Sequence, residues 1–328
     1  MKISVCMGIY NGKKYIEEQL ECIRKQTLRP DEVILCDDGS TDGTREFLQE
    51  YLLSNSELTG WKVLLNEQNK GYPGNFYYAM EQCTGDIVFL ADQDDVWDIH
   101  KIERMTEVMK EREDIKVLGC TFGLIDSSDE AIHTVMAPTT QQDTGAVKNI
   151  SIGQVFYKCE WPGMVLAYRN DWYRNMLRDT IVLEEQQKER TVSEEQQQER
   201  GRIPHDFFLC ARAAEENGFC QLEERLAYHR RHDNNAGGEE HRIGHLLNKE
   251  RKLKEIRDYN AILEQFSNGN VMQTAEGRDA LEVKRDSIRG RYEALASGKL
   301  RKVLGNAWHH RSEVRMATLV CDVLIVWK

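Results

Sequence analysis

Proline is scarce in this sequence, and its distribution is uneven. Only five of the 328 residues are proline, and the last of them is Pro204. Because proline interrupts helices, the stretch that follows is free to be helical. Leu253, Ile256 and Leu263 supply part of an apolar face for such helices. We therefore expect residues 239–328 to form a helical C-terminal extension.

Basic charge is also lacking. The chain has 44 Lys and Arg against 55 Asp and Glu, a net charge of −11, which excludes the basic footprint of a nucleic-acid-binding protein. Residues 239–328 carry 17 basic and 13 acidic residues, which leaves 27 and 42 for residues 1–238. With 40% hydrophobic and 30% charged residues, the composition is typical of a soluble enzyme.

Metal-binding cysteine pairs and a signal peptide are absent from the pattern. The nine cysteines are an odd number, and Cys6 and Cys36 fall within expected core strands. This usage predicts reduced thiols and a cytoplasmic protein, and the start of the sequence does not resemble a signal peptide.

A long hydrophobic run is missing as well. The apolar segment 316–328 is too short and too interrupted to span a bilayer. The basic residues that precede it suit an anionic inner leaflet; they are Arg301, Lys302, Arg311 and Arg315. We expect a cytoplasmic protein that either binds the inner face of the membrane peripherally or packs this segment on the catalytic domain or on another subunit.

What the sequence does contain is an alternation of strands and helices. Apolar runs at 3–7, 32–36, 61–65 and 87–91 are separated by segments with helical periodicity. This alternation predicts an α/β fold with a mostly parallel sheet, in which ligands bind outside the carboxyl ends of the strands.

Carboxylates stand where two of these strands end. Asp92-Gln93-Asp94-Asp95 follows the fourth strand directly, and such oxygen ligands suit Mg²⁺ or Mn²⁺ together with a substrate's phosphates. The alternative is a solvated acidic loop. Asp37 and Asp38 follow the second strand, where capping of the next helix is the alternative.

Four motifs occur in a fixed order: Tyr10-Asn11-Gly12, Asp37-Asp38-Gly39-Ser40, the segment 66–71, and Asp92-Gln93-Asp94-Asp95. They resemble the nucleotide-sugar glycosyltransferases of family 2, which have the GT-A fold, over about the first 125 residues and more loosely to Gly238. With His205-Asp206 and Tyr228-x-Arg230-x-His232, the set is most similar to rhamnosyltransferase-type members. The resemblance implies a GT-A-like, Rossmann-like domain over 1–238, with a nucleotide-sugar-binding half at 1–125 and an acceptor half at 126–238.

The resemblance implies a site for a pyrimidine nucleoside-diphosphate sugar. Tyr10 would contact the base, or as an alternative merely pack at the rim, and Asp37 or Asp38 would accept the imide N–H of the base. Asp92 would lie near the ribose or the metal, and Asp94 would ligate a Mg²⁺ or Mn²⁺ ion that bridges the phosphates. The expected donor-binding set is completed by Asn11, Asn69, Gly71, Arg230 and His232. Of these, Arg230 and His232 would close over the pyrophosphate, and His232 is also counted with Asp94 at the metal.

The acceptor half would supply the catalytic base. An inverting transfer needs a group that takes the proton of the attacking hydroxyl, and Asp206 at the start of the helix after Pro204 is the candidate, with helix stabilisation as the alternative. His205 would orient Asp206 or contact phosphate. Trp161 and Gly163 fall where the family lines its acceptor cleft, although Trp161 suits the core equally well. The polar insertion 184–202 would be a mobile loop or an acceptor lid.

These observations lead to one main expectation. The chain would be a metal-dependent inverting glycosyltransferase that moves a sugar, with rhamnose favoured, from a dTDP- or UDP-sugar to a saccharide or lipid-linked acceptor in cell-surface polysaccharide synthesis. One alternative is a sugar-nucleotide pyrophosphorylase, although a Gly-rich triphosphate loop is not found after the first strand. Another is a catalytically silent scaffold whose C-terminal helices bind a membrane or a partner helix; for the enzyme itself, homo-oligomer contact through these helices is a further expectation.

Overall fold

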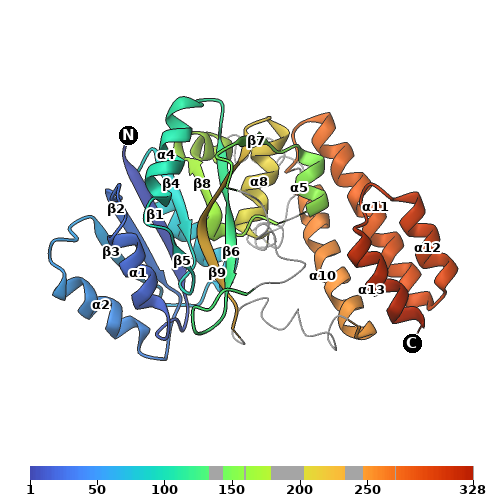
Figure 1. The fold of residues 1–328 in the computed structure, drawn as a ribbon, viewed down its shortest axis with the longest axis horizontal. Helices are drawn as coiled ribbons and strands as arrows, with labels where there is room; N and C mark the ends of the chain where they lie inside the picture. Colours follow the sequence, from blue (N-terminus) through green and yellow to red (C-terminus); the bar gives the residue numbers. More distant parts are fainter. Residues whose placement is uncertain (133–142, 159, 179–202, 233–246, 270, 328) are drawn as a thin grey trace, which may run out of the picture. The chain divides into compact units, whose positions relative to one another are not determined.

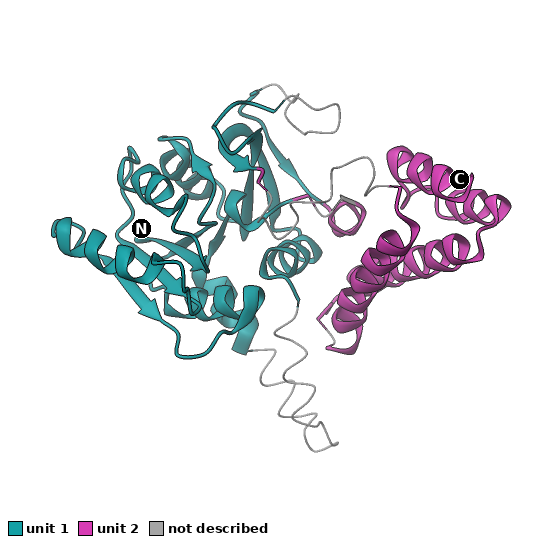
Figure 2. Ribbon diagram, turned by 90° about the horizontal axis from the view of Figure 1, so that it is seen from below, with its two compact units in different colours: residues 1–150, 161–230 teal, residues 151–160, 231–328 magenta. Residues whose placement is uncertain are grey.

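The computed structural model describes residues 1–132, 143–158, 160–178, 203–232, 247–269 and 271–327 (Figure 1). The chain forms two compact units, coloured separately in Figure 2. Unit 1 comprises residues 1–150 and 161–230, and unit 2 comprises residues 151–160 and 231–328. The expected boundary after Gly238 lies outside the described residues, as does the insertion 184–202.

Unit 1 is built on a mixed sheet, which in the described residues has nine strands. The order is β3-β2-β1-β4-β8-β6-β9-β5, and β7 pairs with β9. The four strands at one side are parallel, as expected; they are β1 (Ile3–Ile9), β2 (Glu32–Asp37), β3 (Trp61–Leu65) and β4 (Ile87–Ala91). Every residue of β2 and β4 is buried, which explains the unbroken apolar runs 33–36 and 87–91.

The other half of the sheet is mostly antiparallel. It contains β5 (Val96–Trp97), β6 (Val117–Ile125), β7 (Val147–Asn149), β8 (Leu166–Arg169) and β9 (Phe219–Arg230). β8 runs antiparallel to both β4 and β6, whereas β6 and β9 are parallel. The expectation of a mostly parallel sheet therefore describes the first half and not the second, because β8 enters between β4 and β6 in the opposite direction.

Helices connect and cover these strands. They are α1 (Ile16–Arg24), α2 (Thr44–Ser54), α3 (Gly71–Gln82), α4 (Lys101–Glu111), the 3₁₀ turn η2 (Gly163–Val165), residues 170–178, and α8 (His205–Glu215). α3 packs on β1 and β2, and α8 packs on β6 and β9. The fold is thus the α/β architecture expected from the alternation of the sequence.

Unit 2 is helical, as expected for the C-terminal extension. It contains α5 (Ile152–Lys158), α10 (Lys249–Asn268), α11 (Ala275–Ser297), α12 (Leu300–His309) and α13 (Met316–Trp327). Ile256 and Leu263 are buried, and Phe156 of α5 packs edge-on against Phe266 of α10. Among the described helices, none is both long and apolar enough to cross a bilayer.

Candidate active site

The candidate site lies at the carboxyl ends of β1, β2 and β4. These ends share one edge of the sheet, because Ile9 pairs with Asp37 and Met7 pairs with Ala91. These strand ends and the loops that follow them carry Tyr10, Asn11, Asp37, Asp38, Asp92 and Asp94, whereas Asn69 and Gly71 follow β3 and Arg230 ends β9. Parallel strands therefore bring together residues that are up to about 80 positions apart in the sequence.

The acidic turn after β4 concentrates negative charge. Burial raises the pKa of Asp92 well above its usual value, and the charges of Asp95, Asp94 and Asp206 raise it further. Asp206 comes from α8, so the candidate base lies close enough to these carboxylates to influence their ionisation. Such repulsion is relieved when a cation binds among them.

Asp95 is oriented by the end of β9. Its Oδ1 accepts a hydrogen bond from the backbone N–H of Arg230 at 2.9 Å, and it lies 2.9 Å from Nδ1 of His229. Burial raises the pKa of Asp95, while His229 opposes that rise. No role was assigned to His229 from the sequence. In the structure its ring, together with the backbone N–H of Arg230, holds the Asp95 carboxylate in place.

Lys101 is a second residue that the sequence did not single out. This first residue of α4 is fully buried, its ammonium donates a hydrogen bond to the carbonyl of Met164, and it lies 3.6 Å from the ring centroid of Trp97. Burial lowers the pKa of Lys101 to about 8, against the opposing influence of Asp95 and Asp92. A buried cation thus borders the acidic turn.

The loop after β1 is tied to the loops after β2 and β4. The side chain of Gln93 makes two 3.0 Å hydrogen bonds to the backbone of Tyr10, one accepted from the N–H and one donated to the carbonyl. Asn11 donates its backbone N–H to Ser40 and accepts from the N–H of Thr41. The Tyr10 side chain remains 51% exposed, which leaves its ring accessible to a base.

Asp37 and Asp38 differ in how their carboxylates are used. Asp38 accepts hydrogen bonds from Asn66 Nδ2 and from the backbone N–H groups of Lys70 and Gly71 at 2.8–2.9 Å. Asn69 donates to the carbonyl of Asp38 at 2.8 Å. Asp38, Asn69 and Gly71, which were expected to bind the sugar nucleotide, are therefore hydrogen-bonded to one another. This network fixes the conformation of the loop before α3.

Asp37 keeps one oxygen without a partner from the described residues. Its Oδ1 accepts from the N–H groups of Gly39 and Ser40 and pairs with Arg45. Its Oδ2 is buried and has no hydrogen bond. A buried carboxylate oxygen of this kind calls for a donor, so Asp37 rather than Asp38 is the better candidate for an imide N–H.

The acceptor residues gather at the start of α8. Burial raises the pKa of Asp206 to about 6, while hydrogen bonds from the backbone of Phe207 and Gly163 act in the opposite direction. His205 is fully buried and stacks on Phe76, with ring centroids 4.0 Å apart. Neither of its ring nitrogens has a hydrogen bond within the described part of the chain. Packing, and not a bond to Asp206, therefore holds His205.

Trp161 and Arg230 have surroundings that differ from the expected ones. Trp161 is only 8% exposed, donates to Gln221 and packs edge-on against Phe219, which favours the core alternative over a sugar platform. The guanidinium of Arg230 is buried and paired with Glu18 and Asp129. It would have to leave these carboxylates to close over a pyrophosphate, so its present effect is to fix the acidic turn.

The carboxylates of the acidic turn fit a metal ion that is also coordinated by the substrate's phosphates, and not a metal ion coordinated by protein side chains alone. In the described ranges, no three His, Cys, Asp or Glu side chains are arranged to hold an ion by themselves. A metal that bridges phosphates needs only one or two protein carboxylates, and Asp94 borders Asp92 and Asp95 in a turn of concentrated negative charge. His232, the other expected ligand, falls in unit 2.

The fold is that of a GT-A-like domain. Residues 4–158 match the model of Glycosyl transferase family 2, the family that the motifs resemble. An Escherichia coli relative described as UDP-Glc:alpha-D-GlcNAc-diphosphoundecaprenol beta-1,3-glucosyltransferase WfgD is 28% identical over 151 residues, which are 46% of this chain and 57% of that one. The chain spans about half the length of the curated relatives it matches.

Solved structures support the same fold. S. aureus TarS 1–349 in complex with UDP-GlcNAc matches 99% of this chain and 90% of its own, with a TM-score of 0.54 and 16% identity. The mannosyltransferase PcManGT from Pyrobaculum calidifontis, in complex with GDP-Man and Mn2+, matches 99% of this chain and 85% of its own, with a TM-score of 0.54 and 14% identity. At these identities the likeness concerns the fold alone.

Proposed function

We propose that this chain transfers a sugar from a nucleoside diphosphate to the hydroxyl of a saccharide acceptor, with a divalent metal and with inversion at the anomeric carbon. The observation that carries the proposal is the position of Asp206 at the start of α8, near enough to the acidic turn for its charge to add to the rise in the pKa of Asp92 that burial, Asp95 and Asp94 cause. A base beside a phosphate-binding metal site is the arrangement that this reaction requires.

In the proposed step, the acceptor oxygen bonds to the anomeric carbon while the bond from that carbon to the diphosphate oxygen breaks. Asp206 takes the hydroxyl proton, and the electron pair leaves with the nucleoside diphosphate. Mg²⁺ or Mn²⁺, held through Asp94 with help from Asp92, would neutralise charge on the two phosphates when bound. The raised pKa of Asp206, about 6, suits a group that must accept a proton near neutral pH.

Donor and acceptor are the finer parts of the proposal. The unpartnered Oδ2 of Asp37 suits the imide N–H of uracil or thymine, and the exposed ring of Tyr10 would stack on that base. The family motifs favour dTDP-rhamnose, with UDP-sugars next. The name of the E. coli relative supports a diphosphate lipid-linked saccharide as acceptor, which would bring the enzyme to the inner face of the membrane during cell-surface polysaccharide synthesis.

A thermal-shift panel tests the donor site. UDP, dTDP, GDP and CDP, with their common sugars, are each added with Mn²⁺ or with a chelator, because a ligand that binds the native state raises the melting temperature. We expect Mn²⁺-dependent stabilisation by dTDP or UDP species that Asp94→Asn removes. The exposed Asp279 of α11 provides the matched control Asp279→Asn, which should respond like the parent.

A transfer assay then tests the chemistry. Asp206→Asn should bind the donor like the parent and transfer no sugar. Parent-like transfer by this variant would exclude Asp206 as the base. No stabilisation by any nucleotide would overturn the transferase proposal in favour of a silent scaffold, and release of pyrophosphate from a nucleoside triphosphate and a sugar phosphate would favour a pyrophosphorylase.

A further inference from the structure

Helix α13 presents an apolar face to solvent. Met316, Val320, Leu324 and Trp327 recur at helical spacing and are 74%, 52%, 48% and 78% exposed, respectively. Residues spaced by three, four and seven positions share one side of a helix. Isolated exposed apolar residues are ordinary, but a continuous stripe along the whole helix marks an interaction surface.

Helix α12, which contacts α13, adds two more apolar side chains. Leu304 and Trp308 stand one turn apart and are 47% and 75% exposed. We call these six side chains of α12 and α13 the apolar face. Its two tryptophans are of the residue type that is enriched at the boundary between lipid and water.

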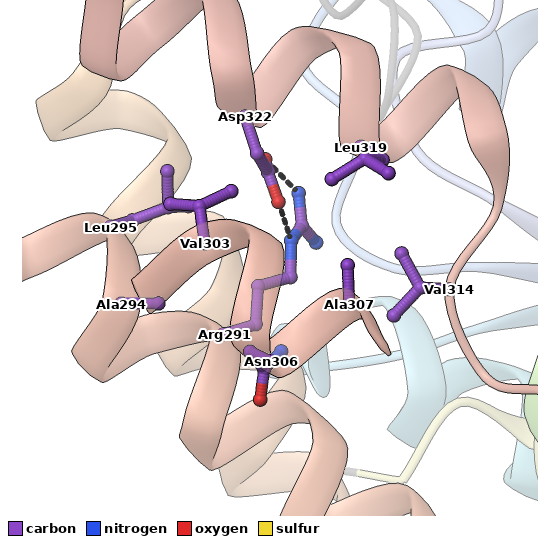
Figure 3. A pocket seen from close by; sticks show the side chains of 9 residues that line it. All are labelled: Arg291, Ala294, Leu295, Val303, Asn306, Ala307, Val314, Leu319 and Asp322. Atoms are coloured by element: carbon purple, nitrogen blue, oxygen red, sulfur yellow. Dashed lines mark hydrogen bonds and ion pairs between the residues drawn. The ribbon is translucent and has the colours of Figure 1, made fainter. Parts of the chain in front are cut away.

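The one charged residue of α13 is turned away from this face. Asp322 is buried and accepts hydrogen bonds from Arg291 Nε and Nη2 of α11 at 2.7 and 2.8 Å. Figure 3 shows this pair inside a small pocket between α11, α12 and α13, which Leu319 and Val303 also line. The ion pair with Arg291 buries and compensates the charge of Asp322, which is the charge within α13 that would oppose its insertion into an apolar phase.

Cations border the apolar face. Arg301, Lys302 and Arg311 are exposed, and the guanidinium of Arg311 lies 5.8 Å from the ring centroid of Trp308. The acidic residues of the segment 300–327 are Glu313 and Asp322. Glu313 is largely covered and lies 4.0 Å from Lys284, and Asp322 is paired with Arg291. The exposed charges that the segment 300–327 itself contributes beside the face are therefore positive.

We propose that the apolar face of α12 and α13 binds the anionic surface of a lipid bilayer. The 12 residues of α13 extend only about 18 Å, against about 30 Å of hydrocarbon, so the helix would lie in the plane of the interface with its stripe inserted. Exposed cations beside inserted tryptophan and leucine are the recognised pattern of such helices.

Charge favours lipid over a second copy of the chain. In a two-fold symmetric contact the same surface meets itself, so Arg301, Lys302 and Arg311 would face a surface with the same cations and without exposed carboxylates from the segment 300–327 to pair with. Anionic headgroups would neutralise the same cations. In the proposed function this docking would bring the enzyme to a lipid-linked acceptor, but vesicle binding needs neither donor nor acceptor and is tested separately from transfer.

Sedimentation of the full chain with lipid vesicles tests the proposal. We expect binding to phosphatidylglycerol vesicles and at least tenfold weaker binding to phosphatidylcholine vesicles. Trp327→Ser and Trp308→Ser should each weaken binding about tenfold, as expected for the loss of a buried aromatic contact. Arg301→Gln and Lys302→Gln should each weaken it about fivefold on anionic vesicles.

Matched controls separate this surface from general stickiness. Leu53 of α2 is 83% exposed, so Leu53→Ser is the same kind of change outside unit 2, and the exposed Lys110 of α4 provides Lys110→Gln. Both controls should bind vesicles like the parent. Equal binding to the two lipids, parent-like binding by Trp327→Ser and Trp308→Ser, or a dimer in ultracentrifugation that these variants dissociate without vesicle binding by the parent, would overturn the proposal.

Discussion

Nδ1 of His229 lies 2.9 Å from Oδ1 of Asp95 across 134 positions of the sequence. The contact joins the end of β9 to the acidic turn that follows β4. The carboxylate of Asp95 is buried, and its Oδ1 is held by His229 and by the backbone N–H of Arg230. The acidic turn is thus shaped by a residue from the opposite half of the domain.

His229→Ala should destabilise the protein and weaken the donor site together. Loss of a hydrogen bond to a buried charged group costs about 1 to 3 kcal/mol, which urea unfolding would measure. Mn²⁺-dependent stabilisation by UDP should fall in the same variant. His100 is exposed, so His100→Ala is the control, and equal behaviour of the two variants would show that the His229 contact is dispensable.

The rate of transfer should depend on pH through Asp206. Its pKa of about 6 means that the carboxylate is protonated below that pH and cannot accept the hydroxyl proton. We therefore expect kcat/KM, which reports the pKa values of the free enzyme, to rise with pH through about 6 and to level off above it. A kcat/KM that is constant from pH 5 to pH 8 would contradict the assignment of Asp206 as base.

Gly163→Ala should disturb the acceptor site. A Cβ there would stand 2.8 Å from Nε2 of His205, which is stacked on Phe76 and cannot yield easily. We expect overpacking of about 1 to 3 kcal/mol and a lower kcat. Gly305 of α12 has no atom within 4 Å of the same added carbon, so Gly305→Ala should stabilise the helix by up to about 1 kcal/mol. Equal melting temperatures for the two variants would contradict this packing.

Asp322→Ala should unfold unit 2 preferentially. The substitution leaves Arg291 largely buried without its bidentate partner, and breaking such a pair costs about 3 kcal/mol or more. Hydrogen exchange followed by mass spectrometry would locate the loss of protection in α11 and α13. The double variant Arg291→Met with Asp322→Leu removes both charges and should recover most of the stability; failure to recover would show that the pair also fixes the packing geometry.

Local pattern was sufficient to predict the parallel half of the fold. The strand 61–65 has the predicted bounds, and β1 and β2 continue two residues and one residue further than predicted, to Ile9 and Asp37. A continuous apolar run predicts a buried strand, and the carboxylates that follow it predict where that strand ends. The approach of the acidic turn to the first strands followed because parallel strands have their carboxyl ends at the same edge.

Environments set by distant residues could not be predicted in this way. Lys101 stands in a charged helical pattern that is typical of a surface, yet the ring of Trp97 and the carbonyl of Met164 enclose it. Arg230 was placed over phosphates by its motif, but Glu18 and Asp129 hold it inside. His229 and Arg230 are adjacent on β9, and only the pairing of that strand brings the ring of His229 and the backbone N–H of Arg230 to Asp95.

The paired hydrogen bonds of Gln93 to the backbone of Tyr10 have a thermodynamic consequence. These bonds connect the loop after β1, which would bind the base, to the turn after β4, which would bind the metal. Ordering of one segment therefore favours ordering of the other. Affinities coupled in this way must change reciprocally. Metal should tighten nucleotide binding by the same factor as nucleotide tightens metal binding, and Gln93→Ala should reduce that factor to the part that direct contact between metal and phosphates supplies.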